Sequence, residues 1–272
     1  TWADKVNDRP QSELWIMEAD GMRPRQLTEG SAPKWSPEGE RIAFIRDGKP
    51  SGAQIHVLWV TSREVTQITR VSESPSEIRW SPDGTTLAFQ MNVPETEDAL
   101  AIKLPKRPEG AKWAEDPKII TRLDYRRDRE GYRPAGWNHL FVVDAEGGTP
   151  RQVTSGNFDH DAGEWTADGN HLVFSGLRSA DADWLLFEAD IYSVEVATGA
   201  ITTLNSRKGE DRGPKVSPDG RFIAYIAAVA MVGPRLRWDA RTSLLAALAD
   251  IPEPRTARFR SVVAFVDPAG RT

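Results

Sequence analysis

The sequence has 272 residues, of which 39% are hydrophobic and 28% charged, with a formal net charge of −5 at pH 7. This composition is typical of globular proteins and unlike that of disordered chains. The excess of acidic residues argues against a nucleic-acid partner, because a protein that binds nucleic acid needs a basic face. The lack of cysteine excludes disulfides, thiolate metal sites and a thiol nucleophile, and no apolar run approaches the roughly 20 residues that span a bilayer.

The chain begins at Thr1, without an initiator Met and without a basic-then-apolar signal segment. We therefore expect an internal cut or a processed N-terminal end. The first predicted element is a hairpin over residues 13–28, in which two strands flank the turn A-D-G. The second, over residues 34–46, runs from a strand ending in Trp through the turn S-P-E-G into a strand of alternating apolar residues.

The residues of this second turn fit a tight reversal of the chain. Pro37 presets φ, Gly39 supplies a positive φ, and the hydroxyl of Ser36 can hydrogen-bond back to the turn. Trp35, a large side chain just before the turn, is expected to point inward and pack between neighbouring sheets.

The two kinds of hairpin alternate along the chain. Two hairpins make one four-stranded propeller blade, and the spacing from Trp35 to Trp80 matches the roughly 40–50 residues of a blade repeat. The sequence therefore predicts an all-β fold, an incomplete β-propeller of four-stranded antiparallel blades, with about four blades within residues 1–226. Further hairpins of the first kind lie at 54–69, 139–154 and 190–204, and further Trp-type units at 79–91, 164–176 and, with Val216 in place of Trp, 215–227.

Residues 92–137 interrupt the repeat. The stretch 94–113 is rich in Pro, Glu and Lys, which predicts an exposed loop, and residues 119–132 alternate charges with aromatics, which predicts a strand running into a charged hairpin. Long insertions on a rigid scaffold often carry function. The alternative interpretation is that the insertion is a solvated surface loop, and for any single residue in it this is favoured over a functional role.

After Ile226 the repeat stops, so we treat residues 227–272 as an atypical tail, a linker or a truncated region. Within it, residues 238–249 have the apolar spacing of a helix and residues 261–270 contain a short strand pattern. An altered reading frame is a further explanation, and the residues favour none of these over the others.

We find no motif for a catalytic centre, a metal site or a cofactor. The sequence lacks G-x-S-x-G, G-x-G-x-x-G, the P-loop and H-E-x-x-H motifs. The acidic pairs at 159–161 and 181–183 fall short of the six to eight oxygens that Ca²⁺ requires, so turn capping is favoured for them. The four histidines, at positions 56, 139, 160 and 171, are scattered along the sequence. Packing or surface roles are favoured for His56, His139 and His171, which lie in or beside predicted strands, whereas His160 lies in a loop.

The S-P-D-G units and the I-A-F strands that follow them resemble the propeller repeats of the prolyl oligopeptidase family of serine peptidases, which also occur in the periplasmic propeller of the Tol system. The segments 120–132, 139–159, 165–176 and 190–199 together look like the N-terminal half of acylaminoacyl-peptidase-like and dipeptidyl-aminopeptidase-like enzymes. The resemblance implies a propeller that caps an α/β-hydrolase domain and restricts access to short peptides. The Ser-Asp-His triad of the family lies in that hydrolase domain, so no catalytic residue is assigned in this chain.

The leading hypothesis is therefore the non-catalytic propeller portion of a serine exo- or oligopeptidase, a hydrolase whose catalytic domain is absent from this chain. Its partners would be short peptides, and we expect it to bind neither nucleic acid nor membranes. Its location would be cytoplasmic. A homo-oligomer is possible. The candidate substrate-facing residues, which would meet a peptide carboxylate or carbonyl, are Tyr125, Arg126, Arg127 and Tyr132.

Two alternatives come from other classes. A protein-binding propeller resembling the Tol-system component would be periplasmic and would dock partners on the top surface of the ring. A sugar-binding or sugar-cleaving propeller would need paired carboxylates that converge on the axis, and the sequence shows no such pair.

Overall fold

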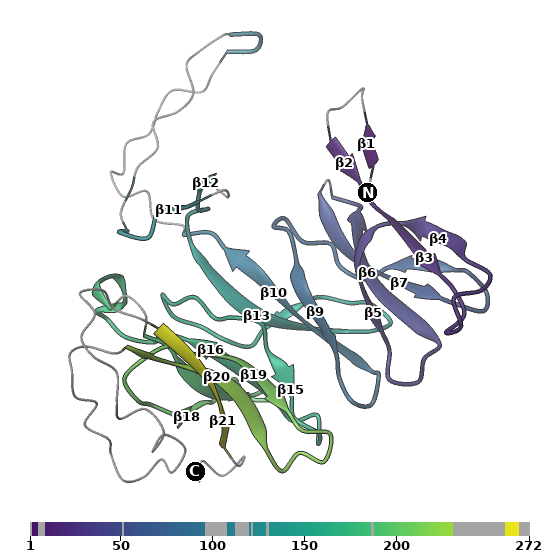
Figure 1. Ribbon diagram of the computed structural model, residues 1–272. Coiled ribbons are helices and arrows are strands. Elements are labelled where there is room, and N and C mark those ends of the chain that lie inside the picture. The colour runs from purple at the N-terminus through teal and green to yellow at the C-terminus, as the bar shows by residue number, and fades with distance from the viewer. Residues whose placement is uncertain are drawn as a thin grey trace.

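The computed structural model describes residues 2–4, 9–50, 52–95, 108–111, 120, 122–128, 131–185, 188–230 and 259–266. In these ranges the regular structure consists of strands and one 3-10 turn, η1 (Ala182–Trp184). The strands form sheets that follow one another in chain order along an arc (Figure 1). The all-β prediction is confirmed. No helix in the described part of the chain is long and apolar enough to cross a bilayer.

Three sheets have four antiparallel strands in the same order, and each combines one Trp-type unit with the hairpin that follows it. These are the predicted blades, and we number them by their place along the arc. The second blade contains β5 (Ser31–Trp35), β6 (Arg41–Asp47), β7 (Ala53–Trp59) and β8 (Val65–Gln67); the third contains β9 (Ser76–Trp80), β10 (Thr86–Val93), β13 (Trp137–Asp144) and β14 (Arg151–Gln152); the fourth contains β15 (Glu164–Trp165), β16 (His171–Gly176), β17 (Asp190–Glu195) and β18 (Ile201–Asn205).

The two ends of the arc carry incomplete sheets. Within the described ranges, the first blade consists of β3 (Glu13–Ile16) and β4 (Arg25–Glu29), preceded by a separate small hairpin of β1 (Trp2–Asp4) and β2 (Arg9–Gln11). The fifth contains β19 (Asp211–Val216), β20 (Ile223–Ala230) and β21 (Phe259–Val266).

The fifth blade includes part of the segment that we treated as a tail. Strand β20 continues past residue 226 to Ala230, and β21 pairs with it along its whole length. The short strand expected within residues 261–270 is therefore present, whereas the helical pattern at 238–249 lies outside the described residues. The boundary between blades and tail stays a prediction.

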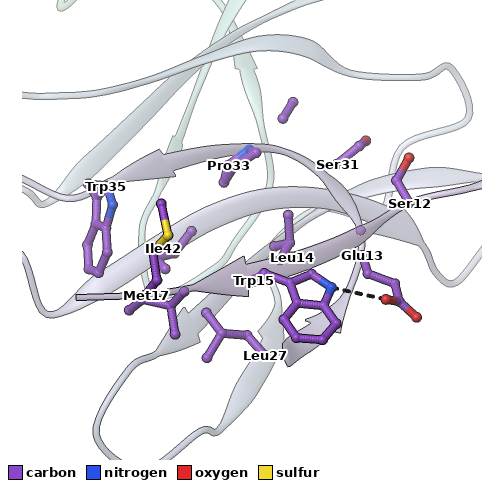
Figure 2. Close-up of a pocket in the computed structure, with 13 residues that line it drawn as sticks. Ser12, Glu13, Leu14, Trp15, Met17, Leu27, Ser31, Pro33, Trp35 and Ile42 are labelled. Carbon is purple, nitrogen blue, oxygen red and sulfur yellow. Dashed lines mark hydrogen bonds between the residues drawn. The ribbon is translucent and has the colours of Figure 1, made fainter. Parts of the chain in front are cut away.

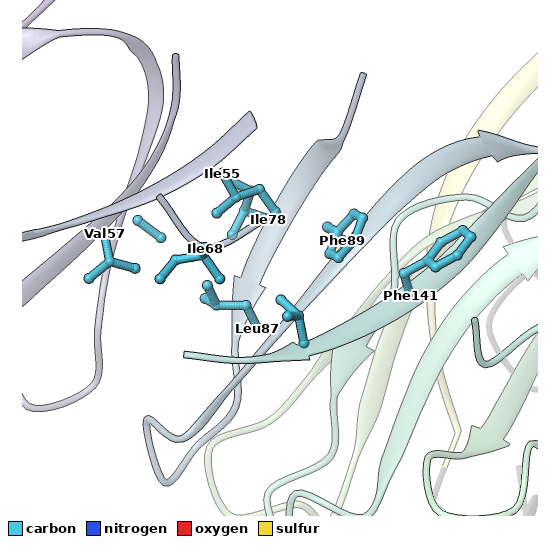
Figure 3. Close-up of a cluster of buried hydrophobic side chains, with 9 residues drawn as sticks. Ile55, Val57, Ile68, Ile78, Leu87, Phe89 and Phe141 are labelled. Atoms are coloured by element: carbon cyan, nitrogen blue, oxygen red, sulfur yellow. The ribbon is translucent and has the colours of Figure 1, made fainter. Parts of the chain in front are cut away.

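The hydrophobic core lies between successive blades. Each cluster of buried side chains takes members from two neighbouring sheets, because alternate residues of a strand point to opposite faces. The cluster between the second and third blades is drawn in Figure 3, where Ile55, Val57 and Ile68 from one sheet meet Leu87, Phe89 and Phe141 from the next. Equivalent clusters join the first blade to the second, the third to the fourth and the fourth to the fifth.

The turn of each Trp-type unit has the predicted chemistry. In the third blade, the Ser81 hydroxyl donates to Asp83 at 2.6 Å and accepts from the backbone N–H of Thr86 at 2.9 Å. This hydroxyl and the N–H of Thr85 hold the pKa of Asp83 below its usual range. Asp168 and Asp219 make the equivalent contacts, so the repeated aspartates are structural.

Substituting Gly84 with alanine should lower the free energy of unfolding more than substituting Gly39. Both glycines have positive φ, +71° and +76°, which costs a non-glycine residue about 1–2 kcal/mol. A Cβ at Gly84 would also lie 2.8 Å from a Glu38 carboxylate oxygen and 3.2 Å from the Arg41 guanidinium, so the ion pair between Glu38 and Arg41 would have to shift, whereas a Cβ at Gly39 meets nothing within 4 Å. Urea denaturation of G84A and G39A measures the difference, and equal losses would contradict this steric argument.

The inner strands β5, β9, β15 and β19 lie next to one another, and tryptophans link the first three of them. The Trp80 indole N–H donates to the carbonyl of Lys34 in the preceding blade at 3.0 Å, and Trp165 donates to that of Arg79 at 3.3 Å. Trp165 is accordingly buried. The prediction that the tryptophan before the turn points inward and packs between sheets is wrong for Trp35, which is 51% exposed. In the described residues, the first blade has no inner strand against which Trp35 can pack, and its ring lies beside a pocket instead (Figure 2).

Candidate functional site

The insertion between β10 and β13 carries a small charged hairpin. Strands β11 (Arg126–Arg127) and β12 (Gly131–Tyr132) pair through Arg126 with Tyr132 and Arg127 with Gly131. The insertion leaves and re-enters the third blade at Val93 and Trp137, which are themselves paired. The hairpin predicted within residues 119–132 is thus present, and it projects from one edge of the blade (Figure 1).

Asp159 anchors the base of this hairpin to the scaffold. One carboxylate oxygen accepts from the guanidinium groups of Arg122 at 3.1 Å and Arg133 at 2.8 Å, and the other accepts from the backbone N–H of Asn138 at 2.9 Å. Burial by itself would raise the pKa of Asp159, but the Asn138 N–H and the two arginines outweigh it and lower the pKa. Asp159 is therefore ionised at neutral pH and carries two charge-assisted contacts.

Three further contacts hold the insertion in place. The Arg122 guanidinium lies 3.5 Å from the centre of the Trp137 ring and donates to the carbonyl of Gly136 at 3.0 Å. The N–H of Leu123 donates to the carboxylate of Asp183 at 3.3 Å. Asp159 and Asp183 were expected to cap turns. Each does accept a backbone N–H, but from the insertion or its edge, so these carboxylates connect separate segments.

The outer surface of the hairpin holds the residues selected from the sequence. Tyr125 and Tyr132 are exposed, with ring centres 6.1 Å apart, and Arg126 is exposed beside them. Arg127 lies on β11, with its side chain outside the described residues. The structure thus brings Tyr125, Arg126 and Tyr132 together as one surface, which we call the tyrosine–arginine surface. Its phenol and guanidinium groups can donate hydrogen bonds to carbonyl and carboxylate oxygens.

A buried histidine pair lies behind the Asp159 anchor. The Nδ1 of His160 is 3.1 Å from the carbonyl of Asn138, and its Nε2 is 2.6 Å from Nη1 of Arg178. Because a carbonyl only accepts and a guanidinium only donates, Nδ1 carries the proton and His160 is neutral. Burial lowers the pKa of His160 to about 4. His139 is also buried, with its ring centre 5.1 Å from that of His160.

Sequence reasoning missed the anchoring residues. Asp159 was weighed only as a turn cap or cation ligand, and Arg122 and Arg133 were not singled out. The only signal for them was an excess of arginine in the insertion, which does not say which arginines are buried. In the described ranges, no group of three or more His, Asp or Glu side chains is arranged to hold a metal ion.

Replacing Asp159 with asparagine should loosen the hairpin. An amide oxygen can still accept from Asn138, but the two charge-assisted contacts to arginine are lost. Trypsin, which cuts after exposed arginines, should then cleave at Arg126 about tenfold faster, because proteolysis follows the population of the open form. The control is D181N, since the Asp181 side chain makes no cap hydrogen bond on η1. Unchanged cleavage in D159N would show that Asp159 does not hold the hairpin.

Comparison with known proteins agrees with this architecture. The family described as dipeptidyl peptidase IV N-terminal region matches residues 96–226. The peptidase YuxL of Bacillus subtilis is 27% identical over 176 residues, which is 63% of this chain and 26% of YuxL. The Tol-Pal system protein TolB of Francisella tularensis is 26% identical over 232 residues, covering 79% of this chain and 50% of TolB. The chain thus spans from about a quarter to about half of the curated relatives it matches.

Solved structures share the fold. Acylaminoacyl peptidase of Pyrococcus horikoshii superposes with a TM-score of 0.60 at 18% identity, over 82% of this chain and 32% of that one. TolB of Acinetobacter baumannii gives 0.50 at 16% identity, over 94% and 46%. The class of the protein is therefore a β-propeller. Within that class, the match to the dipeptidyl peptidase IV N-terminal region and to YuxL confirms its resemblance to the N-terminal propeller of prolyl oligopeptidase family peptidases.

Proposed function

We propose that this chain is the non-catalytic propeller portion of a serine exo- or oligopeptidase and that it gates the access of short peptides to a hydrolase domain. The observation that supports this best is the family match over residues 96–226, which includes the whole tyrosine–arginine surface. A propeller can act as a size filter because its rigid blades leave only narrow passages for a folded protein, whereas an extended peptide passes.

Within this proposal, the tyrosine–arginine surface meets the peptide. Arg126 and Arg127 offer positive charge to a carboxylate, and the hydroxyl groups of Tyr125 and Tyr132 offer donors to backbone carbonyls. The Asp159 carboxylate contributes by forming ion pairs with Arg122 and Arg133, so that these two arginines hold the hairpin while Arg126 is exposed to solvent.

The first experiment assays the purified chain with aminoacyl and acylaminoacyl chromogenic substrates. We expect no hydrolysis, since the triad of the family belongs to the hydrolase domain. A hydrolytic activity that copurifies with the chain would overturn its assignment as non-catalytic.

The second experiment uses the natural full-length protein with the substitutions R126A and R127A. Removing charge-assisted contacts to substrate should raise KM for short peptides about tenfold, the equivalent of about 1.4 kcal/mol, with a smaller change in kcat. R25A, at an exposed position on β4 of the first blade, is the control. Equal KM and kcat values for R126A, R127A and R25A would show that this surface does not contact the substrate.

A protein-binding propeller is the second candidate, because the TolB relative matches a larger share of this chain than YuxL does, 79% against 63%. The peptidase proposal expects a cytoplasmic location and this alternative a periplasmic one. Cell fractionation with an antibody against the chain separates them, and a periplasmic protein without peptidase activity would favour the alternative.

A further inference from the structure

A short segment around His160 bridges the third and fourth blades at the end from which the insertion leaves. The N–H of His160 donates to the carbonyl of Asn138 on β13 at 2.9 Å, and the N–H of Asp161 donates to the carbonyl of Ser175 on β16, also at 2.9 Å. The residue before His160 is Asp159, which anchors the insertion. The anchor therefore depends on a backbone segment that is fixed between two blades.

The His160 side chain is fully buried in this junction. Its ring packs against the ring of His139 on β13, with 5.1 Å between centres, and meets Phe174 on β16 edge-to-face at 5.2 Å. Phe174 in turn stacks on Tyr192 of β17, whose hydroxyl donates to the carboxylate of Asp190 at 3.2 Å. The imidazole thus lies where three strands of two blades meet.

Arg178, which follows β16, closes the junction. Its Nη1 lies 2.6 Å from Nε2 of His160 and donates to the carbonyl of Ser155 at 3.0 Å, and its guanidinium lies 4.9 Å from the centre of the Phe158 ring. Since Nδ1 of His160 donates to the carbonyl of Asn138, both ring nitrogens are engaged. Arg178 therefore holds the loop that leads to the anchor, and it does so through a neutral imidazole.

The charged and titratable groups around His160 leave no room for a second positive charge. Asp159 and Asp161 flank it in its own segment, His139 faces it from β13 and Arg178 from the segment after β16. Asp159 is already paired with two arginines, and Asp161 accepts from a serine hydroxyl. A proton on Nε2 would set two donors against each other 2.6 Å apart with no acceptor between them. Arg178 therefore has to leave when His160 takes up a proton.

We propose that the contact between His160 and Arg178 is a proton-sensitive latch that positions the tyrosine–arginine surface. A proton from solvent binds Nε2, Arg178 leaves, and the loop that contains Ser155 and Phe158 is released. Asp159 then loses the fixed backbone from which it holds the insertion. His160 and Arg178 are thus positioning residues, which act on the surface through Asp159. The consequence for peptide gating rests on the proposed function, whereas the opening of the latch does not.

Proton linkage sets the size of the effect. Burial lowers the pKa of His160 to about 4, and in the open junction the imidazole regains its ordinary value of 6.5. Between these values the open form binds the proton and the closed form does not, so each pH unit of acidification raises the equilibrium constant for opening up to about tenfold. From pH 7 to pH 4.5 this constant should rise about 50-fold.

Native-state hydrogen exchange measures the opening residue by residue. In the purified chain, the amides of Arg133 and Asn138 report on the insertion, because they donate to the carbonyl of Tyr125 and to the carboxylate of Asp159. After correction for the intrinsic effect of pH, their protection factors should fall about 50-fold between pH 7 and pH 4.5. The Gly84 amide, in a turn that does not contact His160, is the reference and should keep its protection.

Low concentrations of urea separate the latch from global unfolding. Opening of the latch exposes little surface, so its exchange should be nearly independent of urea, whereas exchange through global unfolding is strongly dependent on it. We expect the pH effect on the Arg133 and Asn138 amides in the urea-independent range. A pH effect confined to urea-dependent exchange would overturn the proposal.

Two substitutions separate the latch from simple packing. H160Q retains an acceptor for Arg178 and a donor for the Asn138 carbonyl but takes up no proton, so the protection of the insertion should be nearly independent of pH. R178M removes the donor and the charge; it should lower protection at pH 7 about tenfold, as the loss of a charge-assisted hydrogen bond does, and reduce the pH dependence. R151M is the matched control, since Arg151 on β14 also donates to a backbone carbonyl, that of Val196.

The two variants also define what would contradict the latch. Protection in H160Q that falls with pH as steeply as in the unmodified chain would assign the effect to another group. Equal protection in R178M and R151M would show that Arg178 does not hold the insertion. Peptide hydrolysis is not a readout in any of these measurements, so a failure of the latch and a failure of the proposed function are distinguishable.

Discussion

Replacing Phe174 with alanine should lower the free energy of unfolding by about 3–5 kcal/mol, the usual cost of removing a large aromatic side chain from a packed core. Phe174 is fully buried on β16, between the third and fourth blades. Its ring stacks on Tyr192 with 5.6 Å between centres and meets the edge of His160 at 5.2 Å. Rigid strands surround the resulting cavity, so little of it can collapse.

Equilibrium denaturation in urea measures this loss. The matched control is F222A, because Phe222 immediately precedes β20 in the fifth blade and is 46% exposed. Its substitution should cost about 1 kcal/mol or less, as for other surface positions. Similar losses in the two variants would show that burial between blades is not the main source of stability. If F174A proves too unstable to purify, F174L retains most of the side-chain volume and should lose about 1 kcal/mol.

The second large effect is a loss of stability in mild acid. Burial, the dominant cause, lowers the pKa of His160 to about 4 from an ordinary value of 6.5. Between these values the unfolded chain binds more protons than the folded one, so the free energy of unfolding falls as pH falls. The contribution of neutral His160 is fully present above about pH 6.5 and is lost progressively toward pH 4. At about 1.4 kcal/mol per pKa unit, the loss reaches about 3 kcal/mol.

Other groups titrate in the same region, so the measurement compares variants. Burial lowers the pKa of His56 and His139 as well, which adds to the slope, whereas it raises the pKa of Asp190 and Asp211, which opposes it. Urea denaturation at pH 7, 5.5 and 4.5 should therefore show a smaller pH dependence for H160Q than for the unmodified chain. H171Q is the control, and an identical slope in H160Q would contradict the assignment to His160.

Much of the architecture was predictable because it is local. The geometry of the turn after Trp80 is dictated by neighbouring residues, namely Pro82, Asp83 and Gly84. The alternation of apolar residues along the next strand, as at Leu87 and Phe89, indicates which face of that strand is buried. Repetition strengthened the prediction, since each copy indicates the same strand–turn–strand unit. The charged hairpin of the insertion was predictable on the same grounds, from alternation within residues 119–132.

The candidate site was predictable only in part. Exposed aromatics and arginines within a long insertion suggested Tyr125, Arg126 and Tyr132, and these lie together. Their anchor was not predictable, because Asp159 lies far from Arg122 and Arg133 in sequence and meets them only in the folded chain, where β13 pairs with β10. The tautomer of His160 likewise depends on Arg178, from a segment that follows β16.

The sequence by itself determined the kind of unit this protein is built from, because turn geometry and strand alternation depend on residues a few positions apart. Only the tertiary structure decided which copies of that unit are complete, which of the repeated tryptophans is buried and which carboxylate holds the insertion. Trp35 and Trp165 occupy the same position in the repeated unit, just before its turn, yet one is 51% exposed and the other 8%. The difference lies in the neighbouring blade, and contacts between blades join residues that no local pattern connects.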